Sequence, residues 1–212
     1  MPVIKRQYNP AQMETLQTPQ SEEQTNPPTG ETDQTSDWKR VALDILETII
    51  LAVVLYLGIN ALSARVRVDG FSMNPSLENG EYILVNKLAY RIGQPTRGDI
   101  IVFSFPRDPS QDLIKRVIGL PGDSVVIQDG EVIVNGLQLE EPYIAAPPVY
   151  NGSWQVEDGN LFVLGDNRNE SKDSHEWGLL PLQNVIGKAV VIYWPTRDWE
   201  IIIHLNVVSA AQ

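Results

Sequence analysis

Residues 70–77 read Gly-Phe-Ser-Met-Asn-Pro-Ser-Leu and stand where the chain changes from a helical to a β pattern. An apolar run and a short basic segment precede them, and short apolar runs typical of β-strands follow. Gly70 and Pro75 favour a turn or kink that holds Ser72 between two large apolar neighbours. Ser72 is therefore a candidate nucleophile, although an ordinary strand-to-turn junction with a solvated serine fits the same residues.

The run before this turn predicts a membrane-spanning helix over residues 41–64. Residues 48–64 carry no charge. As a helix they reach about 26 Å, close to the ~30 Å hydrocarbon core of a bilayer. Basic residues flank the run in similar number on both sides, so the positive-inside rule leaves its orientation open. An uncleaved anchor is the preferred interpretation, but Ala61-Leu62-Ser63 also resembles a signal-peptide cleavage site.

Composition limits the class of protein. The 212 residues suggest one domain plus tails, and the net charge of −11 argues against binding to nucleic acid. The absence of cysteine excludes disulfides and thiolate metal sites. Only two histidines occur, so a His-rich zinc site is not expected, and no phosphate-binding glycine loop is present. We therefore expect no metal and no cofactor. Residues 1–40 are polar and predict a disordered tail.

Beyond residue 65 the chain reads as β almost throughout. Asp129-Gly130 and Asn135-Gly136 are hairpin signals, and no helix is predicted in this part. The predicted fold is mostly β: one N-terminal transmembrane helix, then an antiparallel β domain over residues 65–212 with a small hairpin and loop excursion at 126–160. The predicted strands cover residues 82–85, 99–105, 113–119, 124–128, 131–134, 161–164, 185–194 and 199–208.

A lysine in one of these strands is a candidate general base. Lys115 and Arg116 are adjacent, so they face opposite sides of the strand, and one of them can point inward. Burial disfavours a charged amine and lowers its pKa, and a neutral lysine can take the proton of a serine hydroxyl. The alternative is an edge strand on which both side chains extend outward.

The segment 165–178 is too polar for a strand and is rich in turn-forming residues. Ser171 and Asp173 can reach into a site from such a loop, and Arg168 can pair with Asp166 or Asp173. A calcium loop fails on spacing, because the third and fifth positions from Asp166 are arginine and glutamate, and no acidic residue closes the loop. A plain surface loop remains the alternative.

Four segments in this order, behind an apolar helix, resemble bacterial type I signal peptidases, the membrane-bound serine proteases that remove signal peptides from exported proteins. The resemblance covers residues 41–195 and is to the smaller members with one anchor. The matching segments are the nucleophile box at 70–77, a structural box at 97–103, the general-base box at 115–123 and a final box at 165–174.

The resemblance implies roles for individual residues. Ser72 attacks the scissile carbonyl and contributes its backbone N–H to the oxyanion hole, Lys115 is the general base, and Ser171 orients the lysine. The residues that brace the site are Asp166, Arg168 and Asp173. The substrate lies as an added β-strand, with small side chains in shallow pockets. The substrate-binding residues are Val66, Val68, Gly70, Met73, Leu77, Ile83, Val102 and Ile114.

Two positions depart from the family pattern. Many relatives have a serine at the position of Gly70, whose hydroxyl completes the oxyanion hole, so that side-chain donor is missing here. Relatives often carry arginine where this chain has His175, so its ion pair with Asp173 is expected to depend on pH or to be absent.

The resemblance also implies partners and a location. The partners are the signal peptides of preproteins and the lipid bilayer, with the tail cytoplasmic and the catalytic domain on the opposite, trans side of the membrane. Trp194, Trp199 and residues 201–203 are interpreted as a core strand, with an apolar surface that dips into the bilayer as the alternative.

Two other functions remain open from the residues alone. One is a Ser–His–Asp hydrolase that uses His175. The other is a membrane-anchored β module that binds a partner without chemistry.

Overall fold

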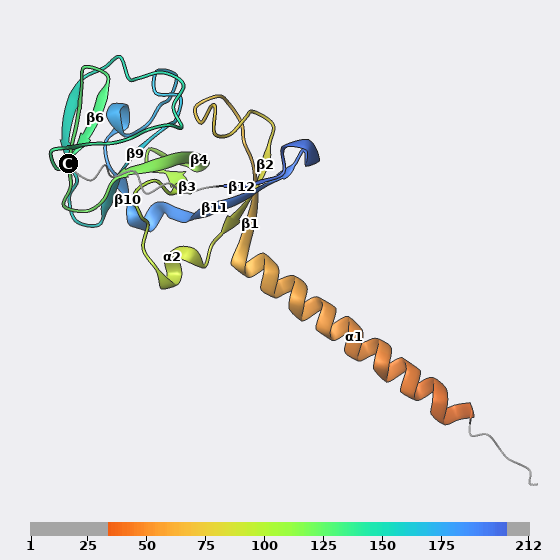
Figure 1. Cartoon of the computed structure of the whole chain (residues 1–212). Helices are drawn as coiled ribbons and strands as arrows, with labels where there is room; N and C mark the ends of the chain where they lie inside the picture. Colours follow the sequence, from red (N-terminus) through yellow and green to blue (C-terminus); the bar gives the residue numbers. More distant parts are fainter. Residues whose placement is uncertain (1–33, 203–212) are drawn as a thin grey trace, which may run out of the picture. The chain divides into compact units, whose positions relative to one another are not determined.

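The computed structural model describes residues 34–202 (Figure 1). Helix α1 (Gln34–Leu62) has 29 residues, and its part from Asp37 to Leu62 is long and apolar enough to cross a membrane. The helix starts before the predicted residue 41, so the assignment of residues 34–40 to a disordered tail is wrong. It ends before residue 64 because the next residues pair with β2. Residues 1–33 of the predicted tail lie outside the described part.

The chain after α1 forms two antiparallel sheets. The larger sheet has the order β1-β2-β11-β3-β4-β9-β10, with β12 paired to β11. The predicted fold class, mostly antiparallel β after one long apolar helix, is confirmed. The strands are β1 (Ser63–Arg67), β2 (Tyr82–Asn86), β3 (Ile100–Phe105), β4 (Asp108–Gly119), β9 (Asn160–Leu164), β10 (Leu180–Pro181), β11 (Val185–Trp194) and β12 (Glu200–Ile201).

The excursion is larger than the predicted hairpin. It is a four-stranded sheet in the order β7-β6-β5-β8, linked to the larger sheet through β4 and β9 (Figure 1). Asp129 and Asn135 have φ of 53° and the glycines that follow them 85° and 82°, as two-residue hairpin turns require. The strands are β5 (Ser124–Gln128), β6 (Glu131–Val134), β7 (Leu137–Gln138) and β8 (Gly152–Gln155).

Short helical turns interrupt the β domain, so the prediction of no helix beyond residue 65 is wrong at these places. The Asp173 side chain caps α3 by accepting from the backbone N–H of His175. Segments of three or four residues are too short to show helical periodicity in a sequence. The turns are α2 (Ala89–Ile92), α3 (Ser174–Trp177), η1 (Leu182–Asn184) and η2 (Thr196–Asp198).

Strand β4 contributes to all three hydrophobic clusters. Ile114 packs in a cluster with Met73 and Leu77, Val117 packs under β3 and β9, and Ile118 packs against the smaller sheet. Apolar contacts on both sides of residues 115 and 116 therefore fix the backbone of β4 at that point. Met73 and Leu77, at 2% and 1% exposed, hold the turn around residue 72 to the same core.

Two of the free strand edges in the part of the chain described lie beside the turn that holds Ser72. Strand β1 pairs only with β2, and β4 pairs with β9 only from Arg116 onward. Residues 112–115 of β4 therefore have no partner strand on one side. Such edges can accept an added strand.

Candidate active site

Ser72 and Lys115 are brought together from segments 43 residues apart. The Lys115 Nζ lies 2.7 Å from the Ser72 Oγ and also donates to the backbone carbonyl of Ile114 at 3.0 Å. Lys115 is only 3% exposed, whereas Ser72 is partly open to solvent. A nucleophile and a base within direct hydrogen-bond reach satisfy the first geometric condition for covalent catalysis.

The environment of Lys115 favours the neutral amine. Burial lowers the pKa of the Lys115 amine to about 8, while the Asp173 and Asp166 carboxylates oppose the shift. At mildly alkaline pH, close to this pKa, a substantial fraction of the amine is therefore neutral and can accept a proton.

The loop after β9 contacts the nucleophile turn through its backbone. The Asn167 N–H donates to the Ser72 carbonyl at 3.1 Å, and the Asn167 side-chain amide donates to the Phe71 carbonyl at 3.2 Å. A Cβ at Gly165 would lie 2.4 Å from the Ser72 carbonyl oxygen. This loop therefore needs glycine at residue 165 to approach the nucleophile so closely.

Two buried ion pairs surround this loop, with partners that differ from the prediction. Asp166 accepts two bonds from Arg116, at 2.8 and 2.6 Å, and Arg168 donates two bonds of 2.6 Å each to Glu141. Arg168 therefore does not use Asp166 or Asp173 as its salt-bridge partner. Arg116 is 2% exposed and does not extend into solvent, because Asp166 neutralises it inside the domain.

The Asp173 carboxylate and the His175 imidazole form a close pair next to Gly165. The fully buried Asp173 accepts from the Gly165 N–H at 2.9 Å and lies 2.6 Å from the Nδ1 atom of His175. The bond to Asp173 raises the pKa of the His175 imidazole. The His175 ring stacks on Tyr150, and its Nε2 faces Glu176 at 3.9 Å.

Ser171 is close to the site but does not make the bond that the resemblance implies. Its Oγ is buried and has no hydrogen-bond partner in the part of the chain described. Lys115 Nζ instead uses Ser72 and the Ile114 carbonyl. The Ser171 Oγ faces the backbone of Gly165, where a Cβ would come within 2.2 Å of it.

A groove of about 100 Å³ runs beside Ser72 between the free edges of β1 and β4. Five predicted substrate-binding residues line it, whereas Leu77, Ile83 and Val102 do not: they are at most 1% exposed and belong to the core beneath. Ile83 on β2 and Val102 on β3 point into this core, and Leu77 joins them from the turn before β2. The lining residues that were predicted are Val66, Val68, Gly70, Met73 and Ile114.

Gly70 lies at one side of the groove with φ of 105°, in the region that favours glycine. Its N–H is bonded to the Asn79 side chain at 2.9 Å. This position therefore supplies no side-chain donor to an oxyanion.

Three residues near the site were not proposed from the sequence as part of it: Arg116, Glu141 and Tyr143. Arg116 was visible as the neighbour of Lys115. Glu141 and Tyr143 belong to a Pro- and Gly-rich loop. Its sequence does not indicate that Glu141 binds Arg168, 27 residues further along the chain.

Known proteins are similar to this chain in sequence. The family model described as signal peptidase, peptidase S26, matches residues 42–194. Probable signal peptidase I-2 of Synechocystis sp. is 44% identical over 161 residues, which cover 72% of this chain and 73% of that protein. Signal peptidase I of Leptolyngbya laminosa is 47% identical over 161 residues, 72% and 79% of the two chains. Signal peptidase I of Bacillus caldolyticus is 37% identical over 166 residues, 71% and 90% of the two chains.

A serine beside a buried lysine, next to a groove with free strand edges, fits a serine endopeptidase. The chain belongs to the signal peptidase family, peptidase S26. The family predicted from the order of the four segments is thereby confirmed, and with it the class of enzyme, a serine endopeptidase that processes signal peptides.

The rate of cleavage should rise with pH through the region around 8, where the Lys115 amine loses its proton. Asp173→Asn removes a carboxylate that favours the charged amine, so the acidic limb of the pH–rate profile should move to lower pH. The measurement is kcat/KM of the full chain from pH 5 to 10. A rate maximum near pH 5 in the parent, or an alkaline shift in the variant, would contradict this assignment.

Gly165→Ala should lower kcat by about 100-fold, because small displacements of a nucleophile cost on this order. The added methyl group would meet the Ser72 carbonyl and the Ser171 Oγ. Gly58→Ala is the matched control, since no atom lies within 4 Å of its Cβ position. Equal activity of the two variants would show that the close approach at residue 165 is not needed.

Proposed function

We propose that this chain cleaves signal peptides from exported preproteins after small side chains, with Ser72 as the nucleophile and Lys115 as the general base. The observation that carries the proposal is the 2.7 Å contact between the two side chains, made by a lysine that is 3% exposed. A charged lysine could not act as a base, so the burial is as important as the contact.

The reaction follows from these positions. The Ser72 Oγ attacks the scissile carbonyl carbon while its proton passes to the neutral Lys115 amine. The Ser72 N–H donates to the resulting oxyanion. When the C–N bond breaks, the Lys115 ammonium gives its proton to the leaving amine. A water molecule then attacks the acyl-enzyme, with Lys115 again taking the proton, which releases the signal peptide and restores the Ser72 hydroxyl.

The size of the groove supports the proposed preference for small residues. Its volume of about 100 Å³ suits side chains such as alanine and serine one and three positions before the cut. The free edges of β1 and β4 supply main-chain hydrogen bonds that do not depend on the substrate sequence. Val66, Val68 and Ile114 limit the size of the residues that enter.

The environment of His175 supports Ser–Lys rather than Ser–His–Asp chemistry. In a triad the second ring nitrogen of the histidine faces the serine hydroxyl. Here the Nε2 of His175 faces Glu176, and the ring stacks on Tyr150.

Single substitutions test the dyad directly. Ser72→Ala and Lys115→Ala should each abolish cleavage of a preprotein by the full chain, while His175→Ala should keep much of it. Because serine and lysine supply both the nucleophile and the base, we propose that no metal is needed, and EDTA should leave the parental rate unchanged. Full cleavage by Ser72→Ala, or loss only in His175→Ala, would refute the dyad.

The finer location is also part of the proposal. The apolar length of α1 and the family suit a single-pass anchor, with the tail cytoplasmic and the β domain on the trans side.

Trp194, Trp199 and Ile201 are 53%, 74% and 73% exposed, so their interpretation as core residues is wrong, whereas Ile202 is in the core. Residue 203 lies outside the described range. Exposed tryptophans next to an isoleucine suit contact with lipid.

Quenching of tryptophan fluorescence by brominated lipids tests this contact in vesicles that hold the full chain. Replacing Trp194 and Trp199 by phenylalanine should reduce the quenched fraction, because fewer indoles then reach the bilayer. Trp154→Phe is the control, since Trp154 on β8 of the smaller sheet packs against Phe162 on β9 of the larger sheet. Equal quenching in the parent and the double variant would argue against lipid contact at this surface.

A further inference from the structure

The loop between β7 and β8 carries a carboxylate and a phenol that the reaction itself does not use. The Glu141 side chain is 6% exposed and accepts both of its short bonds from Arg168. Tyr143 is 8% exposed and donates its hydroxyl to Glu141 at 2.8 Å. Burying such polar groups is costly unless they are paired. Here Glu141 is paired with Arg168 of the active-site loop, and Tyr143 is paired with Glu141.

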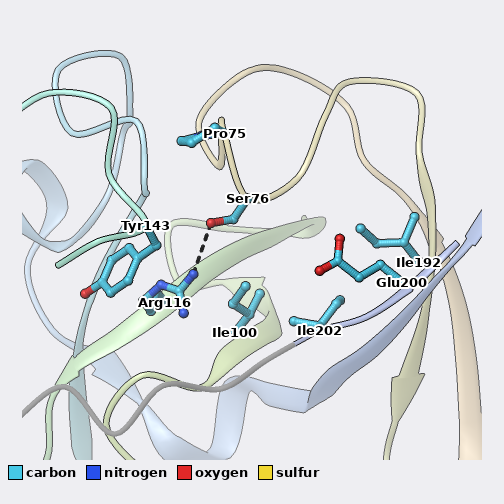
Figure 2. Close-up of a pocket in the computed structure, with 8 residues that line it drawn as sticks. All are labelled: Pro75, Ser76, Ile100, Arg116, Tyr143, Ile192, Glu200 and Ile202. Carbon is cyan, nitrogen blue, oxygen red and sulfur yellow. Dashed lines mark hydrogen bonds between the residues drawn. The ribbon is translucent and has the colours of Figure 1, made fainter. Parts of the chain in front are cut away.

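The Tyr143 ring connects this loop to both buried arginines. The Cζ atom of Arg116 lies 3.9 Å from the ring centroid, and that of Arg168 lies 5.9 Å from it. Figure 2 shows the Tyr143 ring beside the Arg116 guanidinium group. The face of an aromatic ring attracts a cation, and the attraction is larger where water is excluded.

Both arginines in turn contact the segments that frame the dyad. Arg116 follows Lys115 directly, binds Asp166 and donates to the Ser76 Oγ at 3.2 Å on the nucleophile turn (Figure 2). Arg168 donates its Nε–H to the Gly165 carbonyl at 3.1 Å. Gly165 is the residue whose backbone approaches the Ser72 carbonyl.

A cavity of about 210 Å³ borders the same contact (Figure 2). Tyr143, Arg116 and Ser76 form one part of its wall, and Ile100, Ile192 and Ile202 form another. A smaller side chain at residue 143 would enlarge this space and leave one face of the Arg116 guanidinium without packing. The Arg116 side chain could then turn and take Asp166 and Ser76 with it.

We propose that Tyr143, supported by Glu141, is a positioning residue for the Ser72–Lys115 pair and acts through Arg116 and Arg168. This inference rests on the proposed function of the pair. It gives the loop of the smaller sheet a part in the reaction, although neither residue touches the reacting atoms. The aromatic ring is the essential feature, because the ring makes the contact with Arg116 and the hydroxyl only adds a bond to Glu141.

The test compares two substitutions at residue 143 in the full chain in detergent micelles, with kcat and KM measured on a signal-peptide substrate. Tyr143→Leu should lower kcat at least about tenfold, or about 1.4 kcal/mol in the barrier, with KM within about twofold of the parent. Tyr143→Phe keeps the ring and should restore kcat to within about threefold of the parent. Tyr193→Leu is the matched control, a tyrosine whose ring contacts Tyr82 instead of the arginines.

Three results would overturn the inference. They are a parental kcat in Tyr143→Leu, a fall of kcat in Tyr143→Phe as large as that in Tyr143→Leu, or a raised KM in Tyr143→Leu with an unchanged kcat. If Tyr143→Leu does not fold, the double variant Glu141→Leu, Arg168→Leu removes the second buried pair without leaving a charge unpaired. A folded double variant with kcat lowered about tenfold supports positioning, and a parental kcat refutes it. If Ser72→Ala or Lys115→Ala remains active in the same assay, the proposed function fails and the inference fails with it.

Discussion

The burial of one amine against one hydroxyl group is the constraint on which the rest of the β domain depends. For the proposed reaction Lys115 has to contact Ser72, which lies 2.7 Å away, and yet be kept from water, because solvation would keep the amine charged. Strand β4 achieves this by packing apolar residues into a different cluster on each side of the lysine. The core of this domain therefore tunes a proton affinity as well as stabilising a fold.

Charged groups around the Lys115 amine offset part of the effect of burial on its pKa. Asp173 and Asp166 both favour the ammonium form and limit how far burial lowers the pKa of Lys115. Each carboxylate is itself paired, Asp166 with Arg116 and Asp173 with His175. The Arg116 pair is permanent, whereas the His175 pair loses its positive charge as pH rises. The field that Lys115 experiences is thus set partly by groups that never touch the substrate.

Local patterns were sufficient for the β class and the long apolar helix, which show as period-two alternation and an uncharged run. The pairing of Ser72 with Lys115, now placed 2.7 Å apart, came from the resemblance of the four segments to the family, because a lysine between apolar pairs can also extend outward from an edge strand. Prediction from the sequence failed where the partner is distant or the segment is short. Arg168 was assigned to carboxylates within its own loop, but Glu141, 27 residues earlier, binds it. Leu77, Ile83 and Val102 have the side chains of a substrate pocket, but only three-dimensional packing shows that they lie below it.

The free edges of β1 and β4 have a consequence beyond the reaction. A free edge that can accept an added substrate strand also offers a place for a strand from a second copy of the same chain. Charged side chains line these edges, with Arg67 and Asp69 beside one and Asp112 on the other. Charged side chains along a free edge disfavour edge-to-edge pairing with another strand. The charges beside this groove are therefore of the kind that makes a free strand edge a poor template for another copy of the chain.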